Sequence, residues 1–142
     1  MRIQRDRVRK KTFGHIEQEL FSYHETKREI QQIRNEWIHR TIHHDNPGAS
    51  RNSLPSDPTG NIAAGISDDE SLKPMEEIIE AIELVVSESD KRTVDFIHEF
   101  YFSKPRMLTM EGIAQKLYLS RMQLYRKRTD VVRRLAQELG WW

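Results

Sequence analysis

The residues with the clearest potential for chemistry are polar and cationic side chains late in the chain, spaced along a helical pattern. Arg and Gln can pair bidentately with guanine and adenine edges, and a DNA major groove admits one α-helix. From residue 103 to 142 the chain holds nine Lys/Arg against three acids, a local charge of +6. This segment predicts a DNA-recognition helix whose outward residues are Arg121, Gln123, Arg126, Lys127 and Arg128.

Roles within this helix follow from side-chain type. Arg121 and Gln123 are expected to touch base edges, together with Tyr125 and with Met122 against a thymine methyl group. Phosphate contacts are expected from a basic set: Lys116, Arg126, Lys127, Arg128 and Arg133. Thr109 and Ser120, which start the two helices of the segment, complete the predicted DNA-binding residues. One helix cannot turn every one of these side chains to DNA.

A helix-turn-helix between Leu108 and Leu139 would position these residues. Thr109 and Ser120 are expected N-caps, Tyr118-Leu119 the turn, and Gly140 a left-handed C-cap. The expected inward residues are Ile113, Ala114, Leu117, Leu124, Val131, Val132 and Leu135. An alternative is a surface helical hairpin whose basic face is merely solvated. Two capped starts, the small Ala114 at the helix crossing and the cationic face together favour DNA.

The N-terminal third predicts a basic arm (residues 1–11) followed by one long helix from Thr12 to about Ile42. The arm would reach DNA phosphates or a minor groove, or only aid solubility. The helix carries an apolar stripe of Phe13, Ile16, Leu20, Tyr23, Ile30 and Trp37. This stripe would pack on the C-terminal helices or pair with a second copy of the chain, and the long linker that follows favours self-association.

The middle of the chain is rich in Pro, Gly and Ser and then strongly acidic. Residues 45–67 predict a linker or loop, with Asp57 or Thr59 capping a short helix. Pro74 is expected at the first position of the next helix. That helix would bury Met75, Ile78, Ile79, Ile82, Val85 and Val86 and turn out Glu76, Glu77, Glu80 and Glu83. The acidic face is interpreted as solvated or as a contact for a basic surface of RNA polymerase.

The next helix is expected to be capped by Asp90 and to end before Pro105. Its inward residues would be Val94, Ile97, Phe100 and Tyr101, and Trp141-Trp142 would form an apolar plug over the bundle. The fold class is therefore all-α, with a long N-terminal helix and a C-terminal helix-turn-helix domain. The predicted divisions are residues 1–44, 45–74 and 75–142.

Composition narrows the function classes. The chain has 142 residues, no cysteine and a net charge of +1. Without cysteine there is no disulfide, thiolate metal site or cysteine nucleophile. The sequence has no apolar run of about 18 residues, so no membrane span is expected. A cytoplasmic protein is expected. His39 and His43, with His44 and Asp45, lack a third ligand at a diagnostic spacing, so helix termination is preferred to metal binding. No cofactor, metal or enzymatic activity is expected.

Two resemblances follow from these motifs. Residues 76–135 resemble region four of bacterial sigma factors, through an acidic helix, the aromatic run Phe100-Tyr101-Phe102 and LTMEGIAQKLYLSRMQLY. The full chain resembles the RinA family of phage transcriptional activators, through KKTFGHIEQELFSYHETKREI, SDPTGNIA and a terminal ELGWW. The chain departs from that family at Lys127, where members often carry tryptophan.

The resemblance implies a phage or prophage activator of late genes, typically the terminase and packaging operon. The expected partner is double-stranded promoter or operator DNA, with host RNA polymerase and a second copy of the chain as further partners and no membrane. An alternative is a sigma-like or anti-sigma-like protein that acts mainly by contacting polymerase or another regulator. An RNA-binding or structural packaging role is less favoured, because the sequence has no base-stacking platform.

Overall fold

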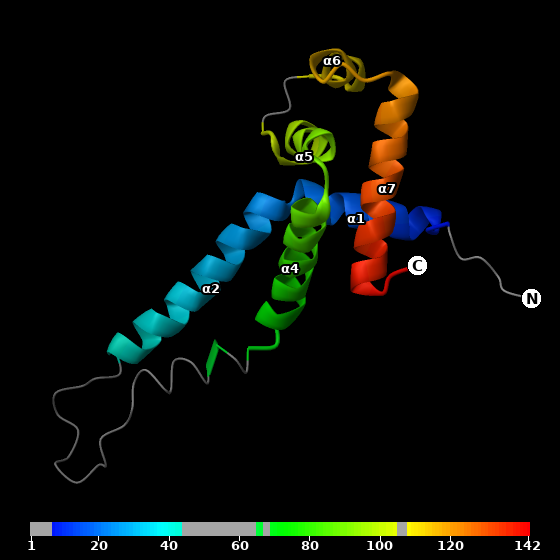
Figure 1. Cartoon of the computed structure of the whole chain (residues 1–142). Coiled ribbons are helices and arrows are strands. Elements are labelled where there is room, and N and C mark those ends of the chain that lie inside the picture. The colour runs from blue at the N-terminus through cyan, green and yellow to red at the C-terminus, as the bar shows by residue number, and fades with distance from the viewer. Residues whose placement is uncertain (1–6, 44–64, 67–68, 105–107) are drawn as a thin grey trace, which may run out of the picture. The chain divides into compact units, whose positions relative to one another are not determined.

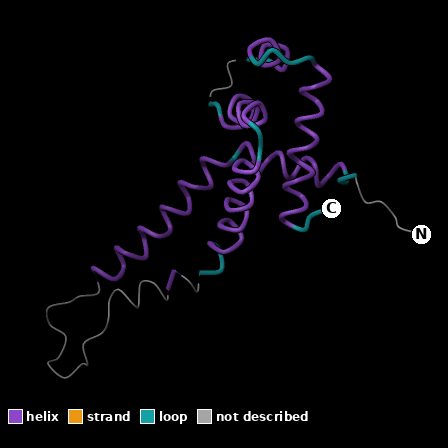
Figure 2. The backbone as a smooth tube through the Cα atoms, viewed as in Figure 1, coloured by secondary structure: helices purple, strands orange, loops and turns teal. Residues whose placement is uncertain are grey.

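The computed structural model describes residues 7–43, 65–66, 69–104 and 108–142, with the backbone alone for residues 41–43. All regular structure in these ranges is helical, which confirms the all-α prediction (Figure 2). The helices are α1 (Lys10–Phe21), α2 (Tyr23–His43), α4 (Leu72–Glu88), α5 (Lys91–Ile97), the π-helix η1 (His98–Phe102), α6 (Met110–Lys116) and α7 (Arg121–Leu139). The predictions for residues 1–6, for the caps at Asp57 and Thr59, and for Pro105 lie outside the described residues.

The described helices divide into two compact units. One unit comprises residues 1–24 and 77–142, and the other comprises residues 25–76. The predicted division at residue 44 therefore differs from the structure, because α1 belongs with the C-terminal helices. Ile16 and Leu20 of α1 are fully buried in the same core as Val131 and Leu135 of α7. α1 packs on α7 (Figure 1) and on η1, so the stripe of residues 10–21 takes the predicted alternative of packing on the C-terminal helices.

The single long helix predicted from Thr12 to Ile42 is wrong at Ser22, where α1 ends and α2 begins. The Ser22 backbone leaves the helical region, at φ −90° and ψ 5°. Aromatic rings on both sides of the break pack on η1. Phe21 lies 5.0 Å from the Tyr101 ring, and Tyr23 stacks on Phe102 at 4.4 Å. Burial of these rings accounts for the interruption, since tertiary packing overrides helix propensity.

The centre of the larger unit is formed by α5 and η1. Asp90 caps α5 as predicted, accepting a hydrogen bond from the Thr93 N–H at 3.1 Å. The change to π-helical hydrogen bonding at His98 was not predicted. It accompanies three successive buried aromatic residues, Phe100, Tyr101 and Phe102, which a regular α-helix would spread over more than half its circumference.

The acidic helix α4 begins two residues earlier than predicted. Its first residue is Leu72, so Pro74 occupies the third position rather than the first. That position still tolerates proline, because the first four N–H groups of a helix lack an intrahelical partner. Of the predicted inner face, Ile79, Ile82 and Val85 are buried, whereas Met75, Ile78 and Val86 are half-buried. The predicted core is thus confirmed at its centre and is partly open at its edges.

The unit of residues 25–76 is held by contacts between α2 and the segment leading into α4. The Trp37 indole N–H donates to Asp69 at 3.0 Å, and Arg34 forms an ion pair with Glu76. Gly65 approaches the Trp37 ring so closely that a Cβ atom there would lie 2.6 Å from it. Hydrogen bonds from Ser71 and Trp37 lower the pKa of the Asp69 carboxyl. Among the described helices, none combines the length and apolar character that crossing a membrane requires.

Candidate nucleic-acid interface

The pair α6 and α7 is joined by residues 117–120, and local hydrogen bonds fix both helix starts. The Thr109 hydroxyl accepts from the Gly112 N–H at 3.1 Å, and the Ser120 hydroxyl accepts from the Gln123 N–H at 3.1 Å. Both predicted N-caps are therefore confirmed, as is the left-handed C-cap at Gly140. In the turn, Tyr118 takes a positive φ of 56°, and the Leu119 N–H bonds the Ala114 carbonyl.

The inward face of this pair determines which residues of α7 face solvent. Six of the seven predicted inward residues are buried, and Leu117 is half-buried; the buried residues are Ile113, Ala114, Leu124, Val131, Val132 and Leu135. Side chains on the opposite side of the first turns are exposed. These are Arg121, Met122, Gln123, Tyr125 and Arg126.

The exposed start of α7 carries cations with no acidic partner. Within the described residues, Arg121 makes no hydrogen bond or ion pair, and the Arg126 guanidinium meets only the Met122 sulfur, at 3.7 Å. The sequence holds no acidic residue between Gly112 and Thr129. The positive charge of Arg121 and Arg126 therefore remains available to an external anion.

Arg128, predicted to contact DNA, instead lies between α7 and α1. Its Nη2 and Nε atoms donate to Glu17 Oε1 at 2.6 and 3.0 Å. The guanidinium also lies over the rings of Phe13 and Phe100, each centroid 5.6 Å away. Burial by itself would lower the Arg128 pKa, but the hydrogen bonds and negative charge of Glu17 outweigh it and raise the pKa. Arg128 is thus a structural cation.

Glu17 connects this ion pair to the aromatic core. The residue is only 7% exposed, and its second carboxylate oxygen accepts from the Tyr101 hydroxyl at 3.4 Å. Burial, with a further contribution from the Glu17 charge, raises the pKa of Tyr101. Glu17 was not singled out from the sequence, although a signal exists. It falls four residues after Phe13 and three before Leu20, so it interrupts an apolar stripe.

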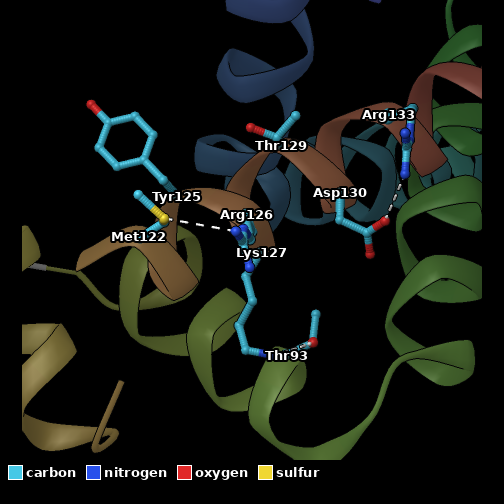
Figure 3. Close-up of a pocket in the computed structure, with 8 residues that line it drawn as sticks. All are labelled: Thr93, Met122, Tyr125, Arg126, Lys127, Thr129, Asp130 and Arg133. Carbon is cyan, nitrogen blue, oxygen red and sulfur yellow. Dashed lines mark hydrogen bonds and ion pairs between the residues drawn. The ribbon is translucent and has the colours of Figure 1, made fainter. Parts of the chain in front are cut away.

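Lys127 also departs from its predicted place on the exposed face. Its side chain is 19% exposed and extends to α5, where the Nζ donates to Thr93 Oγ1 at 3.1 Å (Figure 3). The same Nζ lies 3.9 Å from Asp90 Oδ1. Hydrogen bonds from Thr93 lower the pKa of Asp90, and the charge of Lys127 contributes to the same shift. Lys127 therefore joins α7 to the start of α5.

The side-chain amide of Gln123 caps the start of α7 and so does not face a DNA base. Its Oε1 accepts from the Ser120 N–H at 2.8 Å, which completes a reciprocal capping box. A bidentate contact with adenine needs that oxygen, so such a contact would break the hydrogen bond that caps the helix. The prediction of a direct adenine contact by Gln123 conflicts with this arrangement.

Two further predicted phosphate contacts are ion-paired at the surface. Lys116 Nζ lies 2.6 Å from Glu99 Oε1, and Arg133 Nη2 lies 3.3 Å from Asp130 Oδ1. Pairs as exposed as these are weak and open easily. Lys116 and Arg133 can still reach a phosphate, but their charge is partly neutralised where they stand.

The outer surface of α7 borders a shallow hollow of about 570 Å³ (Figure 3). It is lined by Thr93, Met122, Tyr125, Arg126, Lys127, Thr129, Asp130 and Arg133. Beyond the predicted set, Tyr118 is 90% exposed in the turn before α7. The sequence predicts this residue only as part of the turn, and no local signal marks it as exposed, because it stands between Leu117 and Leu119.

In the described ranges, no three His, Asp or Glu side chains gather closely enough to hold a metal ion, and His44 and Asp45 lie outside those ranges. No protein-family model, curated protein or solved structure matches the chain.

Proposed function

We propose that the protein binds double-stranded DNA by placing the start of α7 in a major groove. The observation that carries this proposal is the exposed pair Arg121 and Arg126, which has no acidic partner among the described residues. A buried inner face and two capped helix starts hold this surface in a fixed orientation. Preorganised cations of this kind suit a polyanion.

Each exposed residue has a role that its chemistry supports. Arg121 is assigned to a guanine edge, where its planar guanidinium donates to O6 and N7. Met122 and Tyr125 are assigned to thymine methyl groups, because both side chains are apolar and exposed. Arg126 is assigned to a phosphate. The hydroxyls of Thr109 and Ser120 can donate to phosphate oxygens while their oxygen atoms still accept the cap bonds.

The biological role proposed is activation of phage late and packaging genes in a bacterial host. It rests on the resemblance to RinA-type activators, and host RNA polymerase and a second copy of the chain are the partners it implies. The DNA-binding proposal is independent of this role, because it rests on the surface of α7.

The test is binding of the purified protein to duplex fragments from upstream of phage packaging genes and to shuffled fragments, over a salt series. We expect selective binding with a steep salt dependence. Arg121→Ala should cost about 1–3 kcal/mol on the preferred fragment and much less on shuffled DNA. Arg28→Ala is the matched control, since Arg28 is equally an exposed helical arginine. Equal losses on both fragments would count against base reading by Arg121.

A second candidate function is contact with RNA polymerase or another regulator. It is favoured by a hollow of about 290 Å³ lined by Glu77, Glu80, Ala81, Leu84, Glu138 and Leu139. Three carboxylates around an exposed leucine suit a basic, partly apolar protein surface. If the wild-type protein binds both DNAs weakly and equally, while Glu80→Lys abolishes polymerase binding, this function replaces the first.

A further inference from the structure

A second hollow lies where the start of α1 meets α7. It measures about 400 Å³ and is lined by Arg7, Val8, Lys10, Phe13, Thr129 and Arg133. Thr129 and Arg133 also line the hollow at the start of α7, so the two depressions adjoin along one side of that helix. The segments that form the second hollow are more than one hundred residues apart in sequence.

Three of the lining residues are cations, and among the described residues only Arg133 has an acidic partner. Arg7 and Lys10 are exposed and have no hydrogen bond or ion pair with any described residue. Arg133 is held only by Asp130, and both side chains of that pair are more than a third exposed. An exposed pair of this kind is weak, so an incoming anion can compete for Arg133. The hollow thus offers three cationic side chains and the Thr129 hydroxyl to an anion.

The base of the hollow is formed by half-buried apolar side chains. Val8 and Phe13 are half-buried, and Phe13 packs under the Arg128 guanidinium. α1 is fixed to α7 by the Glu17–Arg128 pair, and to the C-terminal residue by the Thr12 hydroxyl, which donates to the Trp142 carbonyl at 2.7 Å. The start of α1, with Lys10 and the preceding Arg7, therefore lies beside α7.

We propose that this hollow binds a backbone phosphate of the same duplex that the start of α7 reads. The inference rests on the proposed DNA-binding function. Twelve residues separate Arg121 from Arg133, or about 18 Å along the helix. This spans up to about five base pairs at 3.4 Å each. The contact would fix the orientation of α7 in the groove without reading sequence, as phosphate contacts generally do.

The test compares two double variants that remove the same charge. Arg7→Gln with Lys10→Gln alters the hollow, whereas Arg28→Gln with Lys73→Gln removes two exposed cations that do not line it. Each phosphate contact contributes about −0.9 to the slope of log K against log salt. We expect the first variant to lower the slope magnitude by up to about one and to lose on the order of tenfold in affinity at low salt. The control should stay near the wild type, and sequence preference should be unchanged in both.

A second measurement uses the wild-type protein on duplexes with single uncharged methylphosphonate linkages. A methylphosphonate at one or two positions flanking the groove contacts should weaken binding of the wild type. The same substitution should not weaken binding of the Arg7→Gln, Lys10→Gln variant any further. If both double variants had equal salt slopes and no methylphosphonate position weakened wild-type binding, the phosphate site would be overturned while the DNA-binding proposal would stand. Failure of the wild type to bind any duplex would instead overturn the DNA-binding function on which it rests.

Discussion

Arg126 and Arg128 lie two residues apart on α7, yet their guanidinium groups have opposite surroundings. Arg126 is exposed and meets only the Met122 sulfur. Arg128 donates twice to the buried Glu17 and lies over two phenylalanine rings. A helix turns about 100° per residue, so two residues reach nearly the other side. The first faces solvent and the second faces α1.

The same division holds for the other cations near α7. The sequence-based charge of +6 overstates what an external anion would meet, because several of these residues have acidic partners. Lys116 pairs with Glu99, Lys127 lies near Asp90, Arg128 pairs with Glu17, and Arg133 and Arg134 share Asp130. All three of the partners of Lys116, Lys127 and Arg128 come from outside the segment used for the charge count. Position on the helix, rather than charge, separates the candidate DNA contacts from the structural cations.

Loss of the Glu17 carboxylate is expected to destabilise the fold strongly. Glu17→Ala leaves the Arg128 guanidinium partly buried with no counter-charge. Removing one partner of a buried pair typically costs about 3–5 kcal/mol, and because Arg128 is partly exposed the expected loss is about 3 kcal/mol. Urea unfolding followed by circular dichroism measures it.

The matched control is Glu19→Ala, on the same helix. Glu19 pairs with the exposed His15 at 3.4 Å, so its removal should change stability by less than about 1 kcal/mol. Equal losses for the two variants would show that the Glu17–Arg128 pair is no stronger than a surface pair.

Tyr101 gives a pH-dependent test of the same cluster. Burial and the Glu17 charge raise the Tyr101 pKa above the unfolded value of about 10. Above pH 10 the unfolded tyrosine loses its proton while the folded one keeps it. Because the unfolded state then binds fewer protons, stability falls as pH rises, by up to about 1.4 kcal/mol per pH unit. Below pH 10 this contribution is fully present.

The measurement is the free energy of unfolding between pH 8 and 11 for the wild type, Tyr101→Phe and Tyr118→Phe. Tyr101→Phe should flatten the alkaline decline, whereas Tyr118→Phe should leave it unchanged because that ring is exposed. An unchanged decline in Tyr101→Phe would mean that other groups carry the alkaline sensitivity.

Local features of the fold could be predicted from the sequence. The caps at Asp90, Thr109 and Ser120 bond their own helices three residues on, and apolar spacing placed Val131 and Leu135 inside. Both depend on residues close in sequence. The Ser120 to Gln123 spacing also carries a capping-box signature, although Gln123 was assigned to a base.

Long-range partners could not be predicted in the same way. Glu17 and Arg128 are 111 residues apart, and spacing within either helix does not identify the other. The break at Ser22 depends on Phe21 and Tyr23 packing against η1, which was itself not predicted. The DNA-binding function, the phage role and the partners stay predictions. The residue-level division between exposed and paired cations needed the tertiary structure.

The adjacent cations Arg126 and Lys127 of α7 are expected to have modest and opposite effects on stability and on DNA binding. Arg126→Ala should leave stability nearly unchanged and lower the magnitude of the DNA-binding salt slope by about one, because its exposed charge is assigned to a phosphate.

Lys127→Ala should instead lower the stability of the fold. It removes a charged, largely buried hydrogen bond to Thr93, which contributes about 1 kcal/mol to folding, and should leave the salt slope near that of the wild type. The two adjacent variants serve as controls for each other, with unfolding and salt-dependent binding measured on both. A salt slope lowered equally by both would place Lys127 on the DNA side of α7 and remove the distinction between exposed and structural cations at this point of the helix.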